Sequence, residues 1–332
     1  MGKVTINYVA REAGVFISTV SNALNDVDVL RPETKAHILE VAERLHYVPN
    51  LNGRNLKAGA TKVIGIFVPY ITGPYMGGLA DAMASRCREA DYELNVFVTQ
   101  QRSSIMSNLL GGRMDGAVML HSPLSTRQEK QLQEEQIPMV YLNKEISGEY
   151  QSGVCFDSYQ TGRMVADYMH SIGITEPGFI TGHIIYAYDS SERARGFLDG
   201  LKAHGMELKK EFTWEGYFSR EASYATMKQY LEKQTGEPKL PQAIFASNDL
   251  SAIGCMEALK EFGISVPEQV KVIGCDDIEL GSYIKPSLTT IRTNFAEQGI
   301  TAVESILRMI QENPMGEMHK LPCSLVERES TL

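Results

Sequence analysis

The stretch from residue 11 to residue 25, REAGVFISTVSNALN, contains polar residues whose spacing suits the recognition of DNA. In a helix, four of them would share one face because they follow the i, i+3, i+4, i+7 spacing: Ser18, Ser21, Asn22 and Asn25. In the major groove such short side chains reach base edges, while Thr19 and backbone amides hold phosphates. A merely solvated helix face is the alternative interpretation of this stripe.

A second set of polar residues follows predicted strands farther along the chain: Asn143 after PMVYL, Asp157 after GVCF, Asn248 after AIFAS and Asp276 after VIGC. Arg193 opens a helix in SERARGF. Ligands of doubly wound sheets bind beyond the carboxyl ends of the strands. Carboxylates accept hydrogen bonds from vicinal hydroxyls and arginine donates to oxygens, so the set predicts a sugar or polyol site. A structural Arg193–Asp276 ion pair is the alternative, and Asp249 and Asp277 are explained equally well as caps of helices or turns.

The sequence lacks the common signatures of catalysis. It contains no H-E-x-x-H, no phosphate loop ending in G-K-[ST], no G-x-S-x-G, and no G-x-G-x-x-G after the first strand. The seven histidines form no cluster, and the five cysteines are scattered without a C-x-x-C pair. We therefore expect no enzyme activity, no metal and no cofactor.

Three short helices are predicted in the first 45 residues. Thr5 is placed to cap the first helix, and Gly14 to form the turn after it. The second helix should run from about Ile17 to Asn25 and bury Val20 and Leu24. The third should begin at Pro32 and direct an apolar stripe inward: Ile38, Val41, Ala42 and Leu45.

From Lys62 onward, short apolar runs alternate with amphipathic segments of helical length, which predicts two lobes of parallel sheet wrapped by helices. Residues 1–60 carry a net charge of +1 within a chain of net −9, so charge does not decide between partners. No run of about 18 apolar residues occurs, and the N-terminus has no export signal. A cytoplasmic location is therefore expected.

Two consecutive segments, VTINYVAREAGVFISTVSNALN and RPETKAHILEVAERLHYVPN, resemble the DNA-binding headpiece of the LacI/GalR family of bacterial transcription regulators. The resemblance continues through VIGIFVPYITGPYM, ERARGF, AIFASNDLSAIG, VIGCDDIELGSYIKPSLTTIRT and VERESTL. It implies a helix-turn-helix headpiece, a hinge helix and a two-lobed core like that of periplasmic binding proteins. The expected limits are 1–49 for the headpiece, 50–61 for the hinge, 62–158 plus 291–322 for one lobe, and 159–290 plus 323–332 for the other.

By this resemblance, Ile17, Ser18 and Asn22 stand at the family's base-reading positions. Leu56 would be the wedge that enters the minor groove, with Arg54 near phosphates. Phe16 replaces the family's usual serine, and several members carry arginine in place of Asn22. Because asparagine pairs best with adenine and arginine with guanine, operator preference is expected to shift at that position.

The resemblance also places Tyr75 and Phe218 where relatives hold aromatic rings against the ligand. Asn143 and Tyr70 each replace a family aspartate, which indicates a ligand different from those of lactose- and galactose-responsive relatives; a nucleobase is the alternative. The expected partners are a pseudo-palindromic operator, a second copy of the chain and a small effector, with a phosphocarrier protein as a further candidate corepressor. A solute-binding sensor without a DNA role is the alternative function, and residues 1–60 argue against it.

Overall fold

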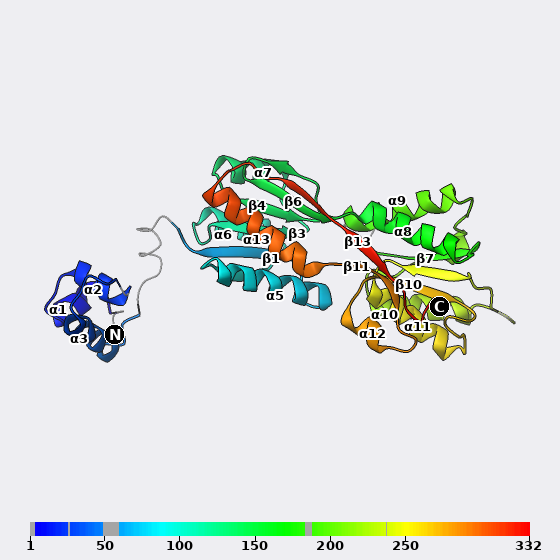
Figure 1. The fold of residues 1–332 in the computed structure, drawn as a ribbon, viewed down its shortest axis with the longest axis horizontal. Helices are drawn as coiled ribbons and strands as arrows, with labels where there is room; N and C mark the ends of the chain where they lie inside the picture. The colour runs from blue at the N-terminus through cyan, green and yellow to red at the C-terminus, as the bar shows by residue number, and fades with distance from the viewer. Residues whose placement is uncertain (1–3, 26, 49–59, 183–187, 237) are drawn as a thin grey trace. The chain divides into compact units, whose positions relative to one another are not determined.

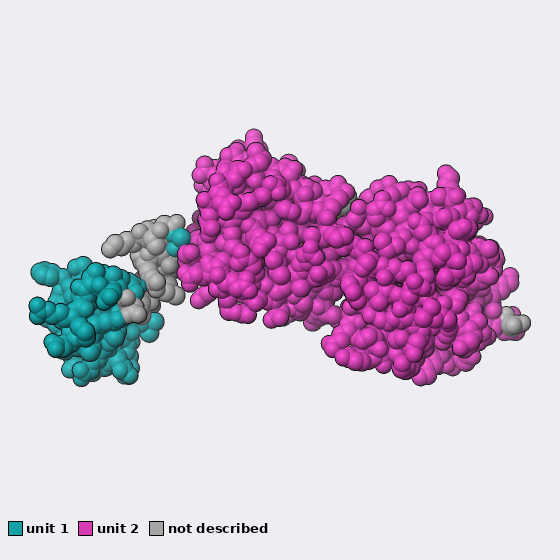
Figure 2. Space-filling view, viewed as in Figure 1, with its two compact units in different colours: residues 1–61 teal, residues 62–332 magenta. Residues whose placement is uncertain are grey.

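The computed structural model describes residues 4–25, 27–48, 60–182, 188–236 and 238–332. The chain divides into two compact units, residues 1–61 and residues 62–332, which Figure 2 shows in different colours. An α-helical first unit and an α/β second unit with two sheets confirm the predicted fold class. Among the described residues, no helix has the length and apolar character needed to cross a membrane.

The described residues of the first unit form three helices, close to their predicted positions: α1 (Ile6–Glu12), α2 (Ile17–Leu24) and α3 (Pro32–Arg44). Val9, Val20 and Ile38, one from each helix, are fully buried in a common apolar cluster. On α2, Ala23 is buried, whereas Leu24 is only half-buried at the margin of the cluster. The 3.6-residue period places Ala23 and Leu24 on opposite sides of Val20, so the buried face of α2 extends to the side of Ala23.

The helices of the first unit begin without side-chain caps. Thr5, Phe16 and Arg31 occupy the N-cap positions with extended backbone, but no side-chain oxygen of theirs accepts a helix N–H. The prediction that Thr5 caps α1 by its side chain is therefore wrong, although its position is right. The turn before α2 depends on Gly14, whose φ of 68° lies in the left-handed region that glycine adopts at little cost.

The described residues of the second unit form two sheets. The larger has the order β12-β6-β4-β3-β1-β2, with the short β5 paired antiparallel to β6 and every other pair parallel. Its strands are β1 (Val63–Val68), β2 (Glu93–Val98), β3 (Gly116–Leu120), β4 (Met139–Leu142), β5 (Ser147–Gly148), β6 (Gln151–Phe156) and β12 (Met318–Leu321). The smaller sheet has the order β13-β11-β10-β9-β7-β8, in which only β13 is antiparallel. Its strands are β7 (Pro177–Thr181), β8 (Thr213–Glu215), β9 (Ala243–Ala246), β10 (Lys271–Asp276), β11 (Thr289–Thr293) and β13 (Cys323–Val326).

Helices cover both faces of the larger sheet because its central strands β1, β3 and β4 are apolar on both sides. On β1, Ile64 and Ile66 pack in the cluster that includes residues of α5 (Pro74–Glu89) and α13 (Phe295–Gln311). Phe67 points to the opposite face and packs in the cluster built by α6 (Arg102–Leu110) and α7 (Thr126–Glu134). This alternation is the two-residue period of a strand buried on both faces.

The smaller sheet is built in the same way. Phe179 of β7 packs toward α8 (Ser158–Ser171) and α9 (Tyr188–Ala203), and its neighbour Ile180 packs toward α10 (Arg220–Glu232) and α11 (Asp249–Glu261). The short elements η1 (Lys210–Phe212) and α12 (Glu279–Tyr283) complete this half. The chain passes between the sheets after β6, after β11 and between β12 and β13 (Figure 1).

Candidate functional site

A cavity of about 770 Å³ lies in the second unit, lined by residues that follow strands of both sheets. Six of the seven residues predicted to bind an effector line it: Tyr75, Asn143, Arg193, Phe218, Asn248 and Asp276. Its size is typical of a small-molecule site. The cavity is the place in the described structure where these polar and aromatic groups converge.

Asp157 is the predicted effector residue that does not line the cavity. It stands at the N-cap of α8, directly after β6, and its Oδ1 accepts the backbone N–H of Gln160 over 3.1 Å. Because α8 begins at the next residue, the side chain of Asp157 caps that helix.

Arg193 is the buried cation of the cavity. Its side chain is 5% exposed, one guanidinium nitrogen donates to the backbone carbonyl of Ser247, and Nη2 lies 3.9 Å from Oδ2 of Asp189. The close approach of α8 and α9 holds its backbone, since a Cβ on Gly162 would lie 2.1 Å from the carbonyl oxygen of Arg193. The ion pair considered with Asp276 is not formed in the described structure, where Asp189 is the paired carboxylate.

Asp276 ends β10 and faces the cavity from the smaller sheet. Burial raises the pKa of its carboxyl well above the usual range, and the positive charge of Arg193 opposes that rise. Its φ of 129° is unusual for a residue with a side chain, so the surrounding structure must hold this turn in place.

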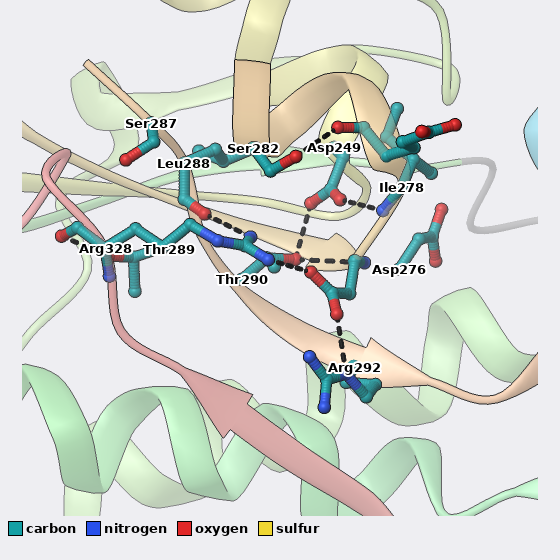
Figure 3. Close-up of polar contacts among 12 residues, drawn as sticks. Asp249, Asp276, Ile278, Ser282, Ser287, Leu288, Thr289, Thr290, Arg292 and Arg328 are labelled. Carbon is teal, nitrogen blue, oxygen red and sulfur yellow. Dashed lines mark hydrogen bonds and ion pairs between the residues drawn. The ribbon is translucent and has the colours of Figure 1, made fainter. Parts of the chain in front are cut away.

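A polar network anchors the segment that follows Asp276 (Figure 3). Asp249 accepts the backbone N–H of Ile278 over 2.8 Å and the hydroxyl of Thr290 over 2.5 Å. Burial raises the pKa of Asp249 to about 6. Neither Asp249 nor Asp277, the two residues left out of the predicted site, lines the cavity. Asp249 is a buried anchor, and the N-cap of α11 is Asn248.

Two arginines hold Asp277 in the same network. Arg328, near the C-terminus, donates to Oδ1 over 2.5 Å, and Arg292 of β11 donates to Oδ2 over 2.6 Å. Burial alone would raise the pKa of Asp277, but the hydrogen bonds from Arg292 and Arg328 lower it. The C-terminal segment thereby fixes the turn that carries Asp276.

On the side of the larger sheet, Gln298 of α13 connects Asn143 and Tyr75, two of the residues predicted to bind the effector. Its Nε2 donates to Oδ1 of Asn143 and to the carbonyl of Val154, each over 3.1 Å, and its Oε1 accepts the hydroxyl of Tyr75 over 2.9 Å. The polar residues predicted for the site from the sequence do not include Gln298. The available signal was a large polar side chain on the mostly apolar inner stripe of α13, which includes Ala302.

Phe218 presents its ring to the cavity from the loop after β8. Its φ of 58° is a left-handed conformation, and a Cβ on Gly182 would lie 2.3 Å from Cζ of its ring, so the ring lies against the end of β7. The amide of Asn248 donates to the carbonyl of Phe218 over 3.2 Å and accepts the N–H of Ser251 over 2.9 Å. Asn248 therefore holds Phe218 in position in addition to lining the cavity.

The predicted DNA-reading residues of the first unit lie on or beside α2. Ser18 and Ile17 are exposed, and the side chains of Ser21 and Asn22 are half-buried, as is that of Thr19. Asn25 follows the helix and its amide donates to the hydroxyl of Ser21 over 3.3 Å, so these two side chains are neighbours. Phe16, just before the helix, is 83% exposed. Arg54 and Leu56 lie outside the described residues.

Comparison with known proteins agrees with both halves of this description. Residues 5–50 match the family described as bacterial regulatory proteins, lacI family, and residues 166–331 match the periplasmic binding protein-like domain. A probable HTH-type transcriptional repressor ExuR of Bacillus subtilis is 31% identical, covering 93% of this chain and 92% of the relative. The HTH-type transcriptional repressor PurR of Actinobacillus pleuropneumoniae is 29% identical, covering 92% and 91%. A lac repressor dimer bound to operator and an anti-inducer shares the fold, with a TM-score of 0.83, 24% identity and complete coverage of both chains.

Proposed function

The chain belongs to the lacI family of bacterial regulatory proteins, and from this premise we propose how it acts on DNA and on its effector. It is a ligand-responsive transcription regulator that binds DNA. We propose that it is a repressor, that the effector is a sugar or a related small metabolite, and that this effector is bound and released chemically unchanged.

On the DNA side, α2 enters the major groove. Ile17, Ser18 and Asn22 contact base edges, and three neighbours support the docking: Thr19, Ser21 and Asn25. Arg54 contacts phosphate and Leu56 enters the minor groove. Two copies of the chain bind one pseudo-palindromic operator, because one helix of this length reads a single half-site. The exposed polar face of α2, opposite the buried Val20, supports this assignment.

On the effector side, the observation that carries the proposal is that six of seven residues chosen from the sequence line one cavity. The buried Arg193 and the half-buried Asp276 offer a donor and an acceptor for hydroxyl groups, and Asn143 adds an amide. Phe218 and Tyr75 offer apolar ring faces that suit the C–H face of a sugar. This chemistry favours a polyhydroxylated effector over a nucleobase.

The coupling between the two functions follows from the position of the cavity between two sheets. Tyr75 and Asn143 belong to the half with the larger sheet, and Arg193 and Asp276 to the half with the smaller one. An effector that contacts both halves changes their preferred arrangement and, through the residues before Lys62, the affinity for operator. Such coupling typically amounts to about 1–3 kcal/mol.

A thermal-shift screen of the full chain with sugars, sugar phosphates and nucleobases tests this proposal. Compounds that raise the melting temperature are then added to an operator-binding assay at fixed salt. We expect a sugar to stabilise the chain and to change operator affinity about 5- to 150-fold. A compound that stabilises the chain strongly and leaves operator affinity unchanged would disprove the coupling.

A further inference from the structure

The described lining of the cavity contains more carboxyl groups than guanidinium groups. Three carboxylates line it, those of Asp189, Asp276 and Glu221, against the two guanidinium groups of Arg193 and Arg220. His121 also lines the cavity, and burial lowers the pKa of its imidazole while the charge of Asp189 opposes this. Its lowered pKa favours the uncharged imidazole near neutral pH, so His121 adds no positive charge to the cavity.

Arg220 is not available to neutralise an anionic ligand. Its Nε and Nη2 donate to Oε1 of Glu257 over 3.1 and 3.0 Å, and its Nη1 donates to Glu221 over 3.3 Å. This arginine is also exposed at the rim, where water screens its charge. The deep part of the cavity therefore contains one guanidinium, that of Arg193, facing Asp189 and Asp276.

Asp189 is a carboxylate without a strong partner among the described residues. Its Oδ1 is buried and accepts no hydrogen bond there, and its Oδ2 lies 3.9 Å from Nη2 of Arg193, beyond hydrogen-bond distance. The Nε of Arg193, on a side chain that is 5% exposed, is likewise buried without an acceptor. Buried polar groups without partners are costly, so both groups favour a ligand that satisfies them.

The negative charge of Asp189 extends across the cavity to the half with the larger sheet. Burial raises the pKa of Tyr70 and Tyr75, and the charges of Asp189 and Asp276 raise it further. These phenols are donors that stay protonated and supply no positive charge. A negatively charged group in this space would meet the carboxyl groups of Asp189 and Asp276 and a single buried cation, and the raised pKa of Asp276 indicates that burial there already disfavours negative charge.

We infer that the cavity selects an effector without negative charge, whose hydroxyl or amino hydrogens donate to Asp189 and Asp276, and that it rejects uronates and phosphorylated sugars. This inference rests on the proposed carbohydrate-binding function and narrows its ligand class. Asp189 is the residue that sets the selectivity, because its carboxylate lies beside Arg193 and its buried Oδ1 accepts no hydrogen bond from the described residues. A hydroxyl or ammonium group completes the hydrogen bonding of Asp189, whereas a carboxylate or phosphate supplies acceptors only.

The test uses matched sugars that differ in charge. Glucose, galactose and mannose are each titrated by calorimetry into the full chain as the neutral sugar, the 2-amino sugar, the uronate and the 6-phosphate. For any skeleton that binds, we expect the neutral or amino form to bind at least about 10-fold more tightly than its uronate or phosphate. Asp189→Asn should reduce this ratio several-fold, whereas Asp199→Asn, the same change on the outer part of α9, should preserve it.

The outcomes separate the two claims. If a uronate or a 6-phosphate binds tightest in the unsubstituted chain, the charge inference is wrong and the carbohydrate function stands. If the Asp189→Asn chain, verified as folded by its melting temperature, keeps the full discrimination, Asp189 does not set it. If no sugar of any charge binds, the carbohydrate function fails, and the charge inference fails with it.

Discussion

The side-chain amide of Gln298 donates a hydrogen bond to Oδ1 of Asn143 over 3.1 Å, joining the middle of the chain to the first turn of α13. The same amide accepts the hydroxyl of Tyr75 over 2.9 Å. Gln298 is fully buried, so these bonds are shielded from water. One side chain on one helix therefore orients two of the residues that line the cavity.

Replacement of Gln298 by leucine should destabilise the chain by about 1–3 kcal/mol, because Asn143 and Tyr75 each lose a buried partner while the volume is nearly kept. Urea unfolding of the second unit measures the effect. The matched control is Gln311→Leu, at the exposed end of the same helix, which should change stability by less than about 0.5 kcal/mol. Equal stability of the two variants would contradict the role assigned to Gln298.

The free energy of unfolding should depend on pH through the ionisation of Asp249. Burial raises the pKa of its carboxyl to about 6 from an ordinary value of 3.8, so the folded state favours the protonated form. The stabilising effect of that proton is complete below about pH 4 and is lost as the pH rises through about 6. This difference between the two pKa values corresponds to roughly 3 kcal/mol in the free energy of unfolding.

This expectation is tested by measuring the free energy of unfolding from pH 4 to pH 7 for the unsubstituted chain and for Asp249→Asn. The free energy of unfolding of the variant, relative to that of the unsubstituted chain, should increase from pH 4 to pH 7. Asparagine keeps an uncharged acceptor for Ile278 at every pH, whereas Asp249 loses its proton. A difference that stays constant with pH would show that Asp249 is ionised throughout.

The first unit should gain stability from a better cap at α3. Arg31 occupies the N-cap position with extended backbone and contributes no side-chain acceptor, although serine there would accept a helix N–H. Arg31→Ser should therefore stabilise α3 by about 1 kcal/mol, seen as slower amide hydrogen exchange in residues 32–44. Arg44→Ser removes the same charge from the last turn and should not slow exchange.

Strand ends could be located from the sequence, and this explains why most of the cavity was predictable. Asn143 and Asp276 were found because polar groups at the carboxyl ends of parallel strands converge at one edge. The same logic chose Asp157, which caps α8 instead, because the sequence does not reveal whether a strand-end side chain turns toward the cavity or toward the next helix.

Residues whose roles depend on tertiary contacts were the ones missed. Gln298 lies in the middle of an amphipathic pattern, and its partners are more than 140 residues away in the chain. Asp189 precedes Arg193 by one helical turn, so an i, i+4 pairing rule could have identified it. Hydrophobic periodicity assigns a residue to a face but does not identify what that face meets.

Operator preference should depend on Asn22. This residue lies on α2, where asparagine pairs best with adenine and arginine with guanine. We expect Asn22→Arg to shift the preferred base in each half-site from adenine toward guanine, by roughly 1–3 kcal/mol of discrimination. Selection from randomised duplexes, followed by titration at fixed salt, measures this shift.

The added positive charge requires its own control. Asn7→Arg places the same charge on an exposed position of α1, and it should raise affinity for all duplexes about equally, because phosphate contacts carry no sequence information. A shift of base preference in Asn22→Arg that is absent in Asn7→Arg identifies Asn22 as a base-reading residue. If both variants only change overall affinity, the half-site is read by other side chains, and the assignment of Asn22 is wrong.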